Sequence, residues 1–496
     1  MARLNNNVLA RCAWALSGVA MLFVTGCRPV GPDYRQPQFS APAAYKETGT
    51  GQVLVPPPNP SGGGWQSATP ADQALRGRWW EIYQDPQLNK LEERIATENQ
   101  SLRQALETYL AAREQVVIAR SSFYPKLSAR AGFAHDKNSA NKPLATATTP
   151  TSYNDITLVA QASWEPDLWG RVRRTVESAR ESAQASAADV ANVDLSLHAQ
   201  MAVAYFQLRG LDAETKLLNA TIDDLERQLD LTQRRLDGGI GTEADVAQAR
   251  TRLETVRAQR IEVGVARARY EHAVGTLANL PLSTYTMSFS PLEGPLPAIP
   301  VGIPSQLLQR RPDVAASERR AAAANAQIGV AASAFYPSIP LVATGGFESA
   351  HGGTWLQGPS ALWSLGAQAA ELLFDAGQRH AVSDQARHNY ESEVAAYRQT
   401  ILSAFQEVED QLSTMRILGE ESTVQHKAVL SANSSFDLAN QRYKGGVTGY
   451  LEVLTAETIL LENQRTFVDL ETRQFVTSVE LVRALGGGWT TSQLPK

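Results

Sequence analysis

The strongest constraint on the fold is an internal repeat, because the chain carries the same short motifs twice and in the same order. Ser121-Ser122-Phe123-Tyr124-Pro125 recurs 212 positions later as Ser333-Ala334-Phe335-Tyr336-Pro337. Leu236-Asp237-Gly238-Gly239-Ile240 recurs 207 positions later as Tyr443-Lys444-Gly445-Gly446-Val447. Between these motifs, the segment 163–170 falls opposite the segment 370–377. Self-similarity of this kind indicates a duplicated architecture.

Each repeat has the same predicted layout: a helix, two strands and a long helical hairpin. Pro125 and Pro337 end the first helix of each repeat, because proline cannot continue a helix. In the first repeat, 78–285, we expect a helix at about 86–121, strands at about 126–136 and 154–165, and a hairpin at 171–279. In the second, 286–486, we expect a helix at about 304–334, strands at about 338–349 and 360–373, and a hairpin at 376–485, before a tail, 487–496.

The predicted strands alternate between apolar and polar residues. Leu127, Ala129, Ala131 and Phe133 alternate with polar or small residues in the first strand, and the other three strands follow the same pattern. A period of two over about ten residues is typical of transmembrane strands, which turn one face to lipid and one to a polar lumen. A half-buried hairpin of a soluble domain shows the same alternation, so the strands alone leave both possibilities open.

The hairpins are exceptionally long. No proline occurs between Pro166 and Pro281, or between Pro359 and Pro495. At about 1.5 Å per residue, the helices predicted at 171–236 and 378–443 are rods of roughly 100 Å. Their thin stripe of small and apolar residues suits helices laid side by side in a coiled-coil sheet or tube. Each rod ends at a glycine turn, after which a second helix returns.

The N-terminus predicts export and lipid attachment. Arg3 and Arg11 precede an apolar stretch that is too short for a spanning helix, which needs about 20 residues. Val24-Thr25-Gly26-Cys27 resembles a lipoprotein cleavage site, so we expect a signal peptide at 1–26 and a lipid on Cys27. A shallow anchor containing an unmodified Cys27 is the alternative. Arg28 favours sorting to the outer membrane, and 27–77 reads as a lipidated, extended Pro- and Gly-rich linker.

Composition excludes several classes of protein. Loss of residues 1–26 removes two arginines and no acidic residue from 46 basic and 51 acidic residues, which leaves a net charge of −7. Such a chain is a poor nucleic-acid binder. With Cys12 removed and Cys27 lipidated, no thiol remains for a disulfide or a metal site. We expect no cofactor beyond the lipid.

The sequence gives no support for an enzyme. Its seven histidines are scattered, and it contains no HExxH, GxSxG or P-loop motif and no GxGxxG ahead of a helix. His380 and His388 could share a helix face, but a solvated face explains them better. Asp167 and Asp375 mark the corner between strand and helix in both repeats, which a structural role explains better than catalysis.

Four strands cannot close a membrane barrel, since the smallest such barrels have about eight. No second long apolar stretch follows the signal peptide, so we expect any membrane crossing to use strands. Bare strand edges are prohibitive in lipid, so several copies must share one barrel. Two copies would supply eight strands and a filled interior, whereas three would supply twelve and an open passage.

The pattern resembles the TolC-like outer membrane factors, in particular their NodT-type or OprM-like lipoprotein branch. The resemblance covers about 27–486. It rests on the Cys27 site, the paired Phe-Tyr-Pro motifs, Trp79-Trp80 followed by Asp85-Pro86-Gln87-Leu88, and the glycine turns ahead of Ala244-Asp245-Val246 and Leu451-Glu452-Val453-Leu454. It implies a mainly α fold with membrane β-strands, in which a homotrimer forms a twelve-stranded β-barrel and a twelve-helix periplasmic α-barrel.

The same resemblance implies a function. Such proteins are outer-membrane channels of tripartite multidrug efflux systems, which dock an inner-membrane pump, here expected to be of the resistance-nodulation-division type, through a periplasmic adaptor protein. A lipid-anchored periplasmic adaptor, or a structural lipoprotein of the envelope, is the alternative, although the duplication argues against an adaptor. The exported substrate, the pump and the resting state of the channel cannot be read from the sequence.

The resemblance also assigns the expected site residues. Asp245 and Tyr443 match positions that form a link closing the periplasmic aperture, and Glu452 matches a constricting carboxylate. Thr455 departs from the family, where many members have a second aspartate. Asp245 and Glu452 could instead only favour the helix dipole, by about 0.3–1 kcal/mol. The predicted adaptor contacts are the turn glycines Gly238, Gly239, Gly241, Gly445, Gly446 and Gly449.

Overall fold

The computed structural model describes residues 28–39, 42, 44–47, 77–139, 152–292, 294–297, 299, 307 and 309–495. The predicted signal peptide and Cys27 lie outside the described residues. The chain divides into two compact units. The first comprises Met1–Pro37, Tyr109–Ala185 and Ser317–Tyr397, and the second comprises Gln38–Thr108, Ser186–Ala316 and Arg398–Lys496. Each unit is described by itself.

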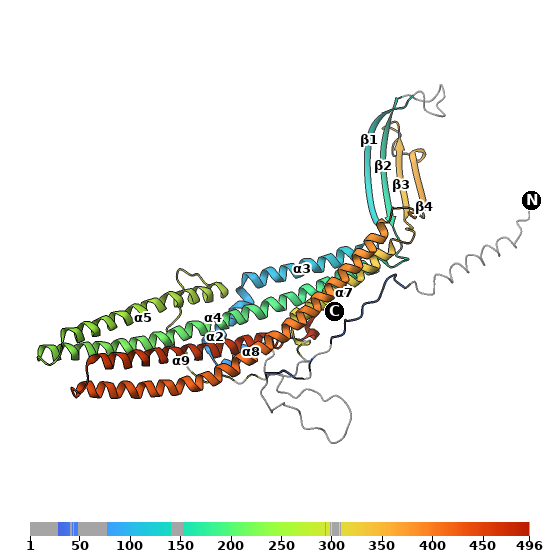
Figure 1. Cartoon of the computed structure of the whole chain (residues 1–496). Coiled ribbons are helices and arrows are strands. Elements are labelled where there is room, and N and C mark those ends of the chain that lie inside the picture. Colours follow the sequence, from blue (N-terminus) through green and yellow to red (C-terminus); the bar gives the residue numbers. More distant parts are fainter. Residues whose placement is uncertain are drawn as a thin grey trace, which may run out of the picture. The chain divides into compact units, whose positions relative to one another are not determined.

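The first unit contains one four-stranded antiparallel sheet in the order β1-β2-β3-β4 (Figure 1). Its strands are β1 (Lys126–Lys137), β2 (Ser152–Trp164), β3 (Leu341–Ser349) and β4 (Ala361–Ala367). The register aligns an apolar row, Ala129, Ala160, Gly345 and Trp363, beside a polar row, Ser128, Gln161, Thr344 and Ser364. Because neighbouring rows point to opposite faces, the predicted alternation becomes one apolar and one polar face.

The fourth strand is shorter than the sequence predicts. We expect it to reach residue 373, but β4 ends at Ala367. Beyond it, Gln368 N donates to Pro340 O and an isolated bridge joins Ala370 to Ser338. The regular ladder stops because β3 begins at Leu341 rather than 338 and Pro340 has no N–H with which to return a hydrogen bond.

The first helix of each repeat also differs from its prediction. The helix expected at 86–121 is divided into α2 (Pro86–Glu98) and α3 (Gln100–Ser121). Asn99 separates them, because its extended backbone ends α2 while its side chain accepts hydrogen bonds from Ser101 N and Leu102 N at the start of α3. In the second repeat, residues 307, 309 and 310 are helical but Arg311 is not, and α7 (Pro312–Ser333) begins after this break, because a residue before proline disfavours helix.

Both repeats turn from strand to helix with the same device, an aspartate that caps the long helix. The carboxylate of Asp167 accepts hydrogen bonds from Val172 N, Arg173 N and Arg173 Nε, before α4 (Arg171–Asp237). Asp375 accepts in the same way from Gly377 N, Arg379 N and Arg379 Nε, before α8 (Gln378–Lys444). These contacts support the structural role predicted for both aspartates.

The described part of the N-terminal segment, residues 28–39 and 44–47, is docked on helices. In the first unit, Arg174 donates to Val30 O, Gly31 O and Asp33 Oδ1. Gly31 lies so close to Gly329 that a Cβ on Gly31 would stand 2.5 Å from the Gly329 Cα. In the second unit, the Glu409 carboxylate accepts from Lys46 N and Glu47 N. The predicted linker is therefore extended but held in these parts.

The second unit holds the main hydrophobic core. The core joins a short 3₁₀ helix, η2 (Trp79–Tyr83), and α2 to α4, α5 (Glu243–Leu277) and α9 (Tyr450–Ala484). Its buried members include Trp79, Leu88, Met201, Tyr205 and Val479. The Trp79-Trp80 pair of the sequence motif thus anchors the start of the first repeat. Among the described residues, no helix combines the length and the apolar character that crossing a bilayer requires.

Candidate functional site at the helical tips

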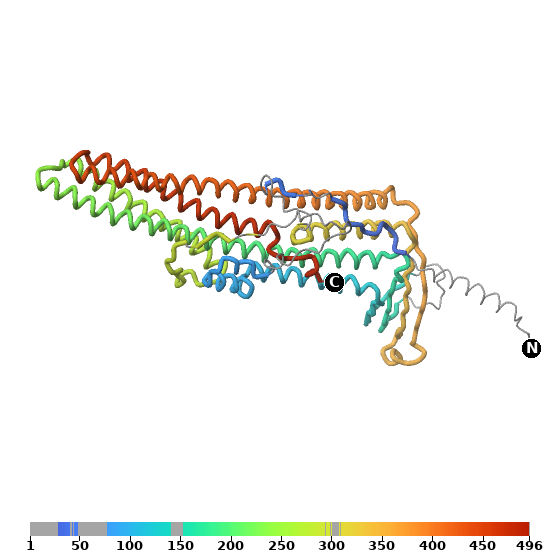
Figure 2. Tube along the Cα trace, turned by 90° about the horizontal axis from the view of Figure 1, so that it is seen from below, coloured from blue at the N-terminus to red at the C-terminus, as the bar shows by residue number. Residues whose placement is uncertain are grey.

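The two helical hairpins of the second unit end side by side, at the same end of the unit in both views (Figures 1 and 2). We call residues 238–241, between α4 and α5, the first tip. Gly239 has a φ of 75°, and Ile240 N and Gly241 N each donate to Arg235 O at 2.9 Å. This left-handed helix end suits glycine, which carries no Cβ to clash.

The second tip, residues 445–449, repeats this geometry between α8 and α9. Gly446 has a φ of 73°, and Val447 N donates to Arg442 O at 2.9 Å. The two tips diverge at the start of the returning helix. Thr242 caps α5, with its side chain accepting from Asp245 N, whereas Gly449 has no side chain with which to cap α9.

This divergence gives two equivalent carboxylates different partners. Asp245 and Glu452 lie 207 positions apart, the offset of the tip motifs, and each is the third residue of its helix. The Asp245 carboxylate completes a capping box, accepting from Thr242 N and, at 2.8 Å, from Thr242 Oγ1. Without such a partner, Glu452 pairs with Arg442 at 2.8 Å, in an exposed position. Glu452 is therefore the more exposed of the two carboxylates, whereas Asp245 is partly buried and satisfied within its own helix end.

Arg235 joins the first hairpin to Tyr443 of the second. Its Nη1 donates to Tyr443 O at 2.7 Å, and its guanidinium lies 4.4 Å from the centre of the Tyr443 ring. Burial raises the pKa of Tyr443, Arg235 opposes this, and the charge of Asp245 adds to it. Asp245 is thus an electrostatic neighbour of Tyr443, but no hydrogen bond joins their side chains in the described part of the chain. Their predicted link stays a prediction.

Buried polar contacts behind the tips tie the two hairpins together. Tyr450 is buried and its hydroxyl donates to Gln228 Oε1 at 3.2 Å. Nearby, Arg252 of α5 and Glu457 of α9 form a largely buried ion pair at 2.7 Å. Neither these two contacts nor the role of Arg235 was predicted from the sequence. On a single helix these residues look like an ordinary polar face, and only the packing of two distant hairpins reveals the partners.

Each tip presents an exposed apolar side chain at equivalent positions. Ile240 is 73% exposed and Val447 is 71% exposed, and Leu451 lies exposed beside Val447. Thr455, where the family pattern expects a carboxylate, is also exposed, and its hydroxyl donates to Leu451 O within the same helix. The tips therefore combine glycines, branched apolar residues and the exposed Arg442–Glu452 ion pair.

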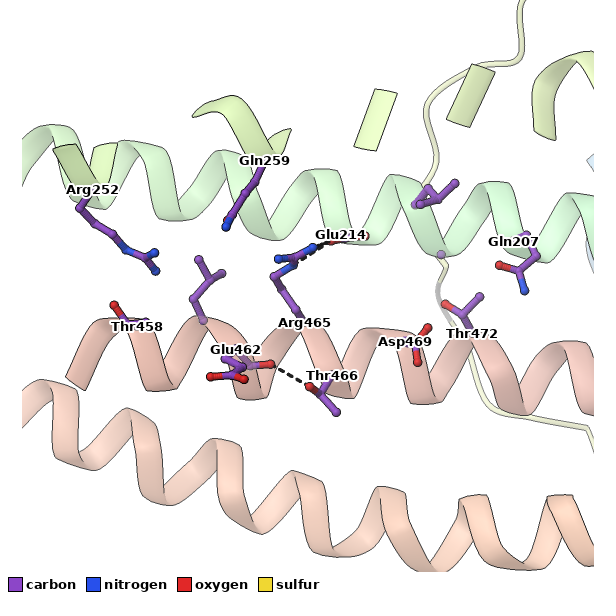
Figure 3. Close-up of a pocket in the computed structure, with 13 residues that line it drawn as sticks. Gln207, Glu214, Arg252, Gln259, Thr458, Glu462, Arg465, Thr466, Asp469 and Thr472 are labelled. Carbon is purple, nitrogen blue, oxygen red and sulfur yellow. Dashed lines mark hydrogen bonds and ion pairs between the residues drawn. The ribbon is translucent and has the colours of Figure 1, made fainter. Parts of the chain in front are cut away.

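A polar cavity of about 590 Å³ lies further along the hairpins, between α4, α5 and α9 (Figure 3). Arg465 of α9 pairs with Glu214 of α4 at 2.6 Å, and Gln259, Glu462 and Asp469 also line the cavity. Within the described part of the chain, no group of three or more His, Cys, Asp or Glu side chains is placed to hold a metal ion. The cavity is a polar seam between the three helices.

Comparison with known proteins assigns this geometry to a family. The profile of the family described as "Outer membrane efflux protein" matches residues 91–280 and 303–487, one stretch in each repeat. The chain belongs to the outer membrane efflux protein family. Its resemblance to TolC-like channels is thereby confirmed, and it is an outer-membrane channel component of an efflux system.

Individual relatives of this efflux protein extend over nearly the whole chain. It is 31% identical to a toluene efflux pump outer membrane protein, TtgC, of Pseudomonas putida, over 96% of this chain and 95% of that protein. It is 30% identical to the pyoverdine export outer membrane protein OpmQ of Pseudomonas aeruginosa, over 84% and 88%. The solved outer-membrane channel OprN is 29% identical, with a TM-score of 0.81 over 93% of this chain and 99% of that structure.

These similarities confirm the predicted fold class and the outer-membrane location. The family consists of transport channels and is not a class of enzymes. Its relatives are named as outer-membrane components of efflux pumps, so this chain works within a pump system.

Proposed function

We propose that three copies of this efflux protein form one passive export duct, with twelve strands in the outer membrane and twelve helices in the periplasm. The observation that carries the proposal is the open sheet. In the described residues, β1 and β4 each pair on one side only. The apolar face is exposed as well, with Trp363 81% and Leu127 78% accessible. Only neighbouring copies can satisfy both edges in lipid.

We propose a lipid on Cys27, which directly precedes the described N-terminal segment. Val30 N donates to Trp169 O, and Pro29 packs so closely on Gly170 that a Cβ there would stand 2.6 Å from the Pro29 Cα. The N-terminal segment therefore starts beside the corner between β2 and α4. A lipid attached one residue before Arg28 would emerge next to the strands, which supports anchoring at the same membrane.

The proposed partners are a periplasmic adaptor and an inner-membrane pump of the resistance-nodulation-division type. We assign adaptor contact to the two tips, with their glycines Gly238, Gly239, Gly241, Gly445, Gly446 and Gly449. The exposed Ile240 and Val447 add an apolar contact at the centre of each tip.

We propose that Asp245, Tyr443 and Glu452 control the aperture at these tips. In a trimer, each side chain becomes a ring of three, and Glu452 is the most exposed of the three. The Arg442–Glu452 pair is exposed, so its own contribution is small, about 0–1 kcal/mol. An aperture held by several weak contacts can open when a partner replaces them.

The proposed cargo is a range of small molecules selected by the pump rather than by the duct. The relatives' names refer to toluene in one case and pyoverdine in another, at nearly equal identity to this chain. Such different cargoes are compatible with a passage that does not bind what it conducts.

The duct is tested with the full mature chain purified in detergent and inserted into planar bilayers. We expect a trimer by light scattering that dissociates on heating, and single channels whose conductance is low until the tips are opened. A monodisperse monomer, or a trimer that binds bilayers without conducting in any state, would refute the proposal.

A further inference from the structure

The second unit contains a cavity of about 460 Å³, well away from the tips, that none of the proposed roles uses. We call it the aromatic cavity. Its walls are Tyr83, Tyr205 and Phe206, with Phe475 from α9, and its lip is the proline-rich segment 290–292 and 294–297. The Phe206 ring lies tilted between two neighbours, with its centre 4.7 Å from the centre of the Tyr83 ring and 5.0 Å from that of the Phe475 ring. The walls are therefore a packed aromatic cluster.

The cavity also has a polar side, made by Asp85 and Arg209 on either side of the Tyr205 ring. The Tyr205 hydroxyl donates to Asp85 Oδ2, while the Arg209 guanidinium lies 4.7 Å from the centre of the Tyr205 ring. Asp85 is the aspartate of the Asp-Pro-Gln-Leu motif, and it caps α2 through Gln87 N and Leu88 N. Both groups line the cavity.

Arg209 has an unused donor there. It is only 2% exposed, and its Nη atoms donate to Asp212, Ser288 O and Gln87. Its Nε has no hydrogen-bond partner among the described residues. A buried donor without a partner is costly, by about 1–3 kcal/mol, so a ligand that brings an acceptor to it gains a stabilising contact.

Backbone hydrogen bonds hold the start of the lip in place. Ser290 N donates to the buried Asp212 at 3.0 Å, and Leu292 N donates to Arg209 O at 3.1 Å. Asp212 is held in turn by Arg267 of α5 at 2.7 Å. The cavity is thus preformed, as small-molecule sites usually are, and its volume lies in their range of about 300–1,000 Å³.

From these contacts we infer that the aromatic cavity binds a small phenolic compound of one or two rings. The ring would stack among Tyr83, Phe206 and Phe475. The phenol oxygen would accept a hydrogen bond from Arg209 Nε, and its hydroxyl would donate a hydrogen bond to Asp85. Binding to the cavity is measured directly on the protein, so it can be tested whether or not the duct proposal holds.

The probe is 2-naphthol, titrated by calorimetry into the full mature chain in lipid nanodiscs, with empty nanodiscs subtracted. We expect saturable binding of one molecule per chain. Naphthalene, which has the same rings and no hydroxyl, should bind at least tenfold more weakly, because the polar side is then unpaired. Leu296→Trp, which fills the cavity from the lip, should abolish binding. Phe289→Trp is the matched control, since Phe289 is exposed and does not line the cavity.

Three results would overturn the inference. They are the absence of saturable 2-naphthol binding by the wild-type chain, equal affinity for naphthalene, and undiminished binding by a folded Leu296→Trp chain. A Leu296→Trp chain that fails to fold is replaced by Leu296→Phe, for which an intermediate loss of affinity is expected and an unchanged affinity would be equally decisive.

Discussion

Glu92 of α2 and His198 of α4 form a buried pair, with 2.7 Å between the Glu92 Oε2 and the His198 Nδ1. Glu92 is 0% exposed and His198 is 4% exposed. The imidazole also stacks on Trp80 at 4.2 Å, and its Nε2 lies 3.4 Å from Asp194. The pair therefore attaches the start of the first repeat to the long helix.

Stability of the second unit should fall as the pH rises, because both groups hold protons more tightly when folded. Burial raises the pKa of Glu92 to about 7, against the opposing effect of His198. Burial alone would lower the pKa of His198, but its bonds to Asp194 and Glu92 raise it to about 9. The stability that Glu92 contributes is fully present below its unfolded pKa of about 4.5, and it is lost as the pH rises through about 7. The stability that His198 contributes is fully present below its unfolded pKa of about 6.5, and it is lost as the pH rises through about 9.

The measurement is thermal unfolding followed by circular dichroism at a series of pH values between about 5 and about 9.5. We expect Tm to fall across this interval, and Glu92→Gln with His198→Asn to flatten the fall. An equally steep dependence in the double variant would contradict the assignment.

The two faces of the sheet should respond oppositely to charge. Trp363 and Ser364 are neighbours in β4, but their side chains point to the apolar and the polar face respectively. We expect Trp363→Asp to block membrane insertion, because a carboxylate on a lipid face is costly. Ser364→Asp is the matched control and should insert normally. Equal insertion of both variants, judged by heat-modifiable trimers in the outer-membrane fraction, would show that the apolar face does not meet lipid.

The glycine of the second tip should tolerate asparagine but not a bulky residue. Gly446 is left-handed, a conformation that costs most residues roughly 1–2 kcal/mol but that Asn adopts readily. We expect Gly446→Trp to abolish drug resistance while trimer and insertion survive, since the added side chain would obstruct adaptor contact. Gly446→Asn should retain most resistance. Full resistance with Gly446→Trp would remove the tip from the adaptor interface.

The aperture should leak when its proposed link is removed. Asp245→Ala combined with Tyr443→Phe deletes both the capping carboxylate and the hydroxyl, and we expect closed-channel conductance in planar bilayers to rise several-fold. Thr242→Ala is the control, because it removes the capping box but leaves the Asp245 carboxylate. If the double variant stays as tight as wild type, or if Thr242→Ala alone opens the channel, Asp245 acts only as a helix cap.

Much of the fold could be predicted because its signals are local or periodic. The paired Phe-Tyr-Pro motifs, the glycine turns and the alternation in β1 and β2 each depend on residues close in sequence. Proline positions and period-two patterns therefore located the strands and long helices closely. The errors arose where a partner decided the outcome, as at β4, whose end depends on Pro340 in the neighbouring strand.

The sequence by itself determined the duplication and hence two hairpins with equivalent tips. Only the tertiary structure decided that Asp245 and Glu452, which occupy equivalent positions, have different partners. The reason is that Thr242 can cap its helix through a side chain, whereas Gly449 cannot. The tertiary structure alone placed Arg235 on Tyr443 and Glu92 beside His198. Such contacts join residues that lie far apart in the chain, and packing brings them together without leaving a pattern in either segment.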